Sequence, residues 1–138
     1  MKEDKKVYQI TRKNRIKEDL QLCHANGDVA YTIPVDINVD KMTARISKAY
    51  ENLGMAQNEL MENQSDVKLM ETYGNAVIEI LSAIFGDDGA KKILEFYEDC
   101  YTEALLDILP FVSNEIMPKI REASAARKEQ LEQAMLRL

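Results

Sequence analysis

The feature that most constrains the fold is an Asn-Gly pair between two alternating segments, in the stretch CHANGDVAYTIPVDIN at residues 23–38. Asn26-Gly27 predicts a two-residue type I′ turn, because that pair tolerates the positive φ needed at both central positions. Such a loop makes a β-hairpin of residues 16–37 in which Leu22 faces Tyr31 and Ile16 faces Ile37. Two isolated strands are only marginally stable in water, so this hairpin needs a surface to pack on.

Alternation along the hairpin predicts one apolar and one polar face. The predicted apolar face consists of Leu20, Leu22, Val29, Tyr31 and Ile33. Pro34 falls opposite Asp19 and has no N–H to donate, which predicts looser pairing or a bulge at that point. Residues 6–11, KVYQIT, are a candidate third strand on the outside of the hairpin.

Helical periodicity runs through the rest of the chain. One amphipathic helix is expected after a cap at Asn38 or Asp40, and a second after Ser65 or Asp66. Gly86 is expected to end the second helix, and a short third helix follows it up to Cys100. The predicted fold class is therefore α+β: an N-terminal hairpin, with two or three strands, packed on a bundle of four to five helices.

The last third of the chain keeps apolar helical spacing but contains two prolines, Pro110 and Pro118. Proline inside a helix removes a hydrogen bond and clashes with the preceding turn, so kinks or breaks are expected before both. After Ala123 the composition becomes Ala, Glu, Gln, Lys and Arg, with a thin apolar stripe at Leu131, Met135 and Leu138. Residues 124–138 are expected to fray or to become ordered on a partner.

Length and charge suggest the broad class of protein. The 138 residues predict one domain over 1–138, with a basic arm or edge strand at 1–15 and a helical body at 39–123. Residues 1–17 carry a net charge of +5, residues 18–115 carry −13 and residues 116–138 carry +2. An acidic body argues against broad nucleic-acid binding. The sequence leaves three interpretations of the basic arm open: a solvated tail, a segment that contacts phosphate, and a segment that docks on the acidic body of a neighbouring copy.

Targeting signals are not evident in the sequence. No apolar run reaches 18 residues, and the segment MKEDKKVYQI lacks the apolar core of a signal peptide. We therefore expect a cytoplasmic protein that does not cross a membrane, with Cys23 and Cys100 as free thiols.

No arrangement of residues predicts catalysis or a cofactor. His24 is the only histidine, and its neighbour Cys23 should point to the opposite face of the strand. A metal site or a catalytic triad needs several convergent side chains, so neither is expected. The chain has seven methionines, most of them at helical spacing. Methionines in such a pattern are more often core residues than parts of an adaptable binding surface, so we expect them mainly in the core. The sequence predicts a protein that is not an enzyme and holds no metal.

Residues 84–116 contain a turn that resembles one in the small tail assembly chaperones of long-tailed phages and prophages of Gram-positive bacteria. In that family an apolar helix ends in a Phe-Gly turn, a second glycine follows, and a Lys-Ile pair begins the next apolar segment. The residues here that match this pattern are Ile84, Phe85, Gly86, Gly89, Lys92 and Ile93. The resemblance covers roughly residues 65–125.

The resemblance implies a function without catalysis. Proteins of that family bind the long, aggregation-prone tape measure protein and keep it soluble while tail tube protein polymerises around it, and many copies coat one chain. It therefore implies tape measure protein, tail tube protein and further copies of this chain as partners. We expect one apolar stripe to face the partner or a second copy: Leu105, Ile108, Leu109, Val112, Ile116 and Ile120. The alternative is a small structural or regulatory adaptor that binds a protein through the hairpin edge.

Overall fold

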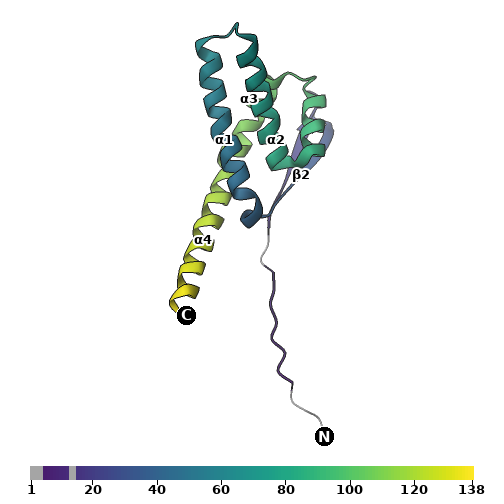
Figure 1. Cartoon of the computed structure of the whole chain (residues 1–138). Coiled ribbons are helices and arrows are strands. Elements are labelled where there is room, and N and C mark those ends of the chain that lie inside the picture. The colour runs from purple at the N-terminus through teal and green to yellow at the C-terminus, as the bar shows by residue number, and fades with distance from the viewer. Residues whose placement is uncertain (1–4, 13–14) are drawn as a thin grey trace.

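The computed structural model describes residues 5–12 and 15–138, which form a hairpin, a helical body and two protruding ends (Figure 1). Residues 5–12 belong to neither a helix nor a strand. The elements follow the chain in this order: β1 (Ile16–Cys23), β2 (Val29–Ile37), α1 (Val39–Glu62), α2 (Val67–Phe96), α3 (Tyr101–Phe111), the π-helical turn η1 (Val112–Ile116) and α4 (Met117–Leu136).

The hairpin is confirmed, and most of its predicted register is present. β1 and β2 pair antiparallel, with Leu22 opposite Tyr31 and Ile16 opposite Ile37. The predicted type I′ turn is wrong, because Gly27 has a positive φ of 92° but Asn26 does not. The His24 N–H instead donates to the Asp28 carbonyl at 2.8 Å. A three-residue loop with glycine in the left-handed position results, and a register shift beside Leu22 restores the pairing beyond it.

The apolar face of the hairpin forms part of the core. Leu22, Ile33, Val35 and Ile37 are buried. Val29 was predicted on this face but is exposed, because it lies beyond the register shift. The bulge expected as one outcome at Pro34 is absent, since Pro34 stays in register opposite Asp19.

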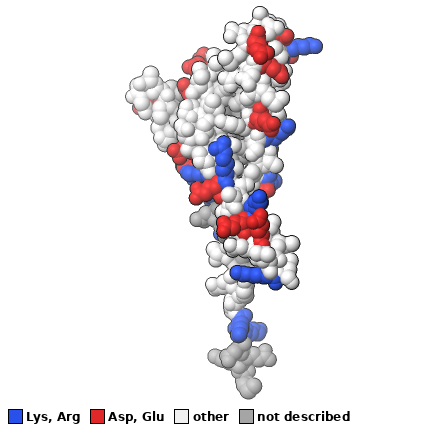
Figure 2. Space-filling view, turned by 90° about the vertical axis from the view of Figure 1, so that its left-hand side faces the viewer, with Lys and Arg blue, Asp and Glu red and all other residues white. Residues whose placement is uncertain are grey.

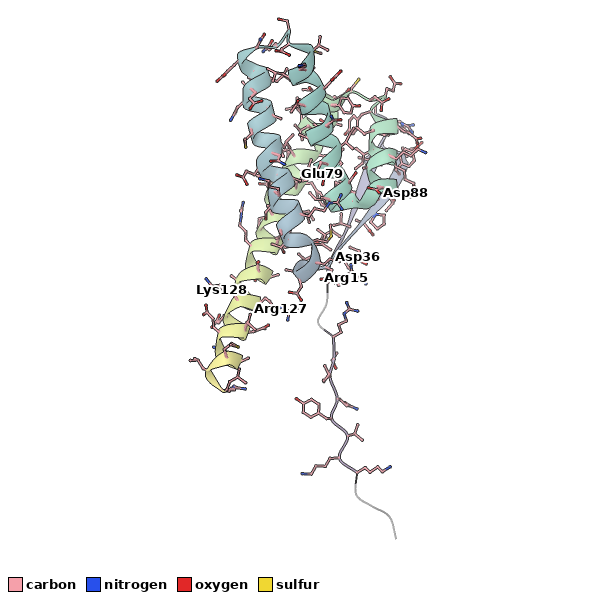
Figure 3. The ribbon with its side chains drawn as sticks, in the orientation of Figure 1. Arg15, Asp36, Glu79, Asp88, Arg127 and Lys128 are labelled. Atoms are coloured by element: carbon pink, nitrogen blue, oxygen red, sulfur yellow. The ribbon has the colours of Figure 1, made fainter. Side chains whose placement is uncertain are left out.

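The third strand expected at residues 6–11 is absent from the described structure. These residues are exposed and pair with neither β1 nor β2. The described sheet therefore has two strands. Pairing of the arm with β1 would require a reversal just before Arg15, whose guanidinium instead lies 2.7 Å from Asp36 at the base of the hairpin (Figure 3).

Polar side chains begin the first two helices as expected. The Asn38 side chain accepts a hydrogen bond from the Lys41 N–H at 3.2 Å at the start of α1. The Asp66 carboxylate accepts from the N–H groups of Lys68 and Leu69 at the start of α2. Each cap satisfies backbone donors that have no partner inside the helix.

Gly86 interrupts α2 without ending it. Its φ of 78° and ψ of 166° lie outside the helical region, so the chain turns there and continues as a second helical segment up to Phe96. This second segment packs against β2. Gly89 lies so close to the hairpin that a Cβ on it would meet Ile33 Cγ2 at 3.0 Å. The turn thus allows one helix to support the hairpin.

The bundle contains fewer separate helices than predicted. The described residues form three continuous helical stretches, at 39–62, 67–96 and 101–136, instead of four to five helices. The third stretch is continuous because Pro110 and Pro118 cause no break. The π-helical turn η1 lies between them, and the Met117 N–H reaches back to the Val112 carbonyl. Pro118 lies just after the π-helical turn, in the first turn of α4.

The core is one cluster shared by the hairpin, α1, α2, α3, η1 and the start of α4. Its largest fully buried side chains include Ile33, Ile46, Ile80, Ile93 and Ile116. The described part contains no buried polar residue. Beyond Ser124 every residue of α4 is exposed, and this half of the helix projects away from the body (Figure 1).

Candidate functional site

An open pocket of about 930 Å³ lies at the tip of the hairpin, beside the end of α2 and the start of α3. It is the most chemically distinctive hollow in the described structure. Three segments that are distant in sequence form it: residues 23–31, residues 95–100 and the first two turns of α3. The kink at Gly86 makes this possible, because it brings the end of α2 against the hairpin.

The inner wall of the pocket is aromatic. Phe96 is central: its ring lies edge-on to Tyr31 with centroids 6.3 Å apart, and edge-on to Tyr97 at 5.1 Å. The centroid of the His24 ring lies 5.8 Å from that of Phe96, with the two planes tilted by 41°. Such tilted pairs are favourable arrangements of aromatic rings, so this wall is a fixed apolar surface.

The rim of the pocket is acidic. Glu95, Glu98, Glu103 and Asp107 line it, and no Lys or Arg does. None of these four carboxylates forms an ion pair with another described side chain. The site therefore offers unpaired negative charge beside aromatic rings, a combination that suits a basic and partly apolar ligand.

Tyr97 connects the wall to the rim. Its hydroxyl donates a hydrogen bond of 2.9 Å to the Asp107 carboxylate. Burial raises the pKa of the Tyr97 phenol well above its usual value, and the hydrogen bond to Asp107 and the negative charges of Asp107 and Glu103 raise it further. Tyr97 therefore remains protonated and donates to Asp107 throughout the physiological range.

The backbone beside the pocket is unusual. Glu98 and Asp99 both have positive φ, at 54° and 60°, which is uncommon for residues other than glycine. This turn separates α2 from α3, where the sequence predicted a helix continuing to Cys100. Asp tolerates the left-handed region better than most residues, but Glu-Asp is not a turn signal, so the pattern gave no usable indication of the turn.

The described residues show no metal-binding cluster. No group of three or more His, Cys, Asp and Glu side chains is placed to hold a metal ion within the described part. Cys23 and Cys100 are both exposed thiols, and both line the pocket. In the described ranges, no helix has the length and apolar content needed to cross a bilayer.

The predicted partner-facing stripe packs inside the chain. Five of its six residues are buried, namely Leu105, Ile108, Val112, Ile116 and Ile120, and Leu109 is half-buried. These side chains are accessible to a partner only if the 101–136 stretch separates from α1 and α2. Their role in partner binding remains a prediction.

The turn motif at residues 84–93 has a clear structural role. Ile84, Phe85 and Ile93 are buried in the core, and Gly86 and Gly89 set the kink and the contact with Ile33. Lys92 pairs with Asp88 at 3.4 Å on the surface of the second segment of α2. The motif therefore positions the hairpin and the pocket beside it.

Exposed apolar side chains gather at the ends of the chain. In the arm these are Val7, Tyr8 and Ile10, and in the last eight residues Leu131, Met135, Leu136 and Leu138. Methionines were expected mainly in the core, but Met117 is the only one buried among those described, and Met55, Met61 and Met70 are exposed on α1 and α2. Figure 2 shows that acidic and basic side chains are interspersed over one face of the body.

Comparison of the chain with protein-family models, curated proteins and solved structures gives no match.

Proposed function

We propose that this chain is a tail assembly chaperone of a phage or prophage, which acts without catalysis in the cytoplasm of the bacterial host. It binds the tape measure protein and keeps it soluble while tail tube protein assembles. The proposal starts from the resemblance at residues 84–93. The observation that supports it most is the projecting half of α4, which is exposed beyond Ser124 and contacts the body through the ion pair of Arg127 with Asp40 at 3.0 Å.

The geometry of this half-helix suits a helical partner. Leu131 is 62 % exposed and Met135 is 60 % exposed. They are four residues apart, so they lie on one narrow stripe of the helix, and Leu138 follows just beyond its end. A single helix of about a dozen residues is marginal in water, and this one gains stability when the stripe is covered. A long helical protein with apolar stripes of its own would cover it.

Co-expression with the tape measure protein encoded beside this chain tests the proposal. The soluble yield of the tape measure protein and the mass of the complex are read by size exclusion with light scattering. We expect several copies of this chain to elute with one tape measure chain. If the tape measure protein stays insoluble and this chain elutes alone, the chaperone proposal fails.

Two matched variants locate the binding surface. Leu131→Asp places a charge on the stripe, whereas Gln133→Asp places the same charge about 200° around the helix. Both positions are exposed, so both variants should fold. We expect Leu131→Asp to lower the co-purified tape measure protein and Gln133→Asp to leave it unchanged. Equal yields would show that α4 is not the binding surface.

The second candidate is an adaptor that binds a protein partner through the edge of the hairpin. It is favoured by the outer edge of β1, which pairs with no other strand in the described structure. A pull-down from infected or induced cells separates the two functions. Tape measure protein in the eluate supports the chaperone, and a different partner that is lost when the β1 edge is blocked supports the adaptor.

A further inference from the structure

Two exposed features of the molecule complement each other in charge and polarity. One is the arm of residues 5–12, and the other is the acidic aromatic pocket at the hairpin tip. In the arm, Val7 is 78 %, Tyr8 88 % and Ile10 85 % exposed, and Lys5, Lys6 and Arg12 add positive charge. Large apolar side chains that are this exposed in one short segment are typical of an interaction site.

We propose that the arm of one copy docks in the hairpin-tip pocket of a second copy. Tyr8 packs on the aromatic wall formed by Phe96 and Tyr31, and Lys5 and Lys6 lie against the carboxylates of Glu95 and Glu103. The pocket offers negative charge with no cation of its own, and the arm offers positive charge with no anion among residues 5–12. This contact does not depend on the tape measure proposal.

Tyr8 cannot reach the aromatic wall of its own chain by folding back along β1. The arm joins β1 at Ile16, whereas the pocket is at the other end of that strand, beside Cys23. Even the tightest reversal, a two-residue loop just before Arg15, would pair Tyr8 with Asp19. That is four residues short of Cys23, or about 13 Å at roughly 3.3 Å per residue. A second copy has no such restriction.

The pattern of contacts follows from this arrangement. The arm and the pocket are different surfaces, so one contact leaves a free arm on one copy and a free pocket on the other. Copies can then add in a row, or two copies can exchange arms and close a dimer. In both cases assembly needs one intact arm and one intact pocket at every contact.

Reciprocal charge reversal tests the contact. The arm variant is Lys5→Glu with Lys6→Glu, and the pocket variant is Glu95→Lys with Glu103→Lys. The control is Lys48→Glu with Lys68→Glu, at exposed sites on α1 and α2. It alters the net charge of the chain by the same amount as the arm variant. We expect wild type and control to self-associate in sedimentation velocity, and each test variant to associate at least about tenfold more weakly.

Mixing the two test variants distinguishes docking between copies from a general charge effect. The intact pocket of the arm variant can accept the intact arm of the pocket variant, and the reversed arm is likewise complementary in charge to the reversed pocket, so an equimolar mixture should associate again. Raising NaCl from about 0.1 M to about 1 M shortens the screening length from about 10 Å to about 3 Å and should weaken association. A monomeric wild type, an unaffected arm variant or a mixture that remains monomeric would overturn the proposal.

The two native cysteines in the pocket provide a second test. Tyr8→Cys, oxidised with diamide, should form a reducible disulfide with Cys23 or Cys100 of another copy and run as a covalent dimer or ladder. Gln133→Cys is the control at an exposed position outside the arm, and it should form much less covalent dimer or ladder. Replacing both native cysteines with serine should abolish the product. A disulfide between position 8 and a pocket cysteine of the same chain, or equal crosslinking by the control, would refute docking between copies.

Discussion

Replacing three glycines with alanine should change stability with different signs, because each glycine is present for a different reason. Gly89 is buried in α2, where a Cβ would meet Phe85 Cβ at 2.9 Å and Ile33 Cγ2 at 3.0 Å. Alanine favours a helix by roughly 0.5–1 kcal/mol over glycine, but overpacking costs roughly 1–3 kcal/mol. We expect Gly89→Ala to lower the free energy of unfolding by about 1–2 kcal/mol.

Gly54 is the matched control. It lies within α1, and nothing comes within 4 Å of the position of its Cβ. Gly54→Ala should therefore raise the free energy of unfolding by roughly 0.5–1 kcal/mol. Gly86 also has open space around it, but its φ of 78° strains any residue with a side chain. Gly86→Ala should lower stability by about 1–3 kcal/mol through the backbone alone.

Urea unfolding followed by circular dichroism at 222 nm measures all three variants. For a chain of this length, 1 kcal/mol corresponds to a shift in Tm of about 3–4 °C, which thermal unfolding can check. If Gly89→Ala is as stable as wild type, the second segment of α2 does not lie against Ile33 as described. If Gly86→Ala is neutral, the chain does not turn at that residue, and the account of the pocket fails with it.

Three further outcomes can be measured on the same protein. Ile116→Ala, in the core, should cost about 2–5 kcal/mol in urea unfolding, whereas Leu131→Ala on the projecting helix should cost less than about 0.5 kcal/mol; similar costs would contradict the burial described. Asp66→Ala removes the cap of α2 and should cost about 1 kcal/mol, and no change in the urea midpoint would exclude that cap. The pKa of Tyr97 is raised in the native state, so the native state holds this proton more tightly than the unfolded state does. The resulting contribution to the free energy of unfolding should be complete below about pH 10 and should decline as the pH rises above it. Absorbance at 295 nm should show one tyrosine that resists ionisation, and Asp107→Asn should make it easier to ionise; six tyrosines that titrate together would refute this.

The hairpin was predictable from the sequence because its signals are local. Asn26-Gly27 and the alternating residues around it determined the strands and most of the register. The turn type was not determined, because Asn-Gly also fits a three-residue loop in which only the glycine has positive φ. The bulge that compensates for this loop exposed Val29 and was not visible in the pattern.

The helices show the limits of periodicity. Polar caps at Asn38 and Asp66 fixed two helix starts, because those side chains satisfy backbone donors close in sequence. The turn at Glu98 and Asp99 has no local signal, and it depends on tertiary packing of α3 against α2. Periodicity also could not distinguish a core stripe from a partner stripe, so the residues from Leu105 to Ile120 were expected at a surface.

The pocket could not be predicted because its residues come from separate segments. Cys23, Phe96 and Asp107 become neighbours only when Gly86 turns the end of α2 toward the hairpin. The sequence did show that the arm and the body carry opposite net charges. That contrast does not depend on the fold, because it follows from the composition of the two segments. What was missing was the location of the unpaired carboxylates.

A double-mutant cycle tests directly whether the turn motif exists to support the hairpin. Ile33→Ala removes the Cγ2 atom that an alanine at position 89 would meet, at the usual cost of a core truncation, about 2–5 kcal/mol. Relief of that contact should make Gly89→Ala less harmful by roughly 1 kcal/mol when Ile33 is already truncated. Ala83→Gly, another small-residue change in the buried part of α2, should show no such coupling with Ile33. If the costs of Ile33→Ala and Gly89→Ala simply add, glycine at position 89 serves only the contact with Phe85, and the hairpin could pack without it.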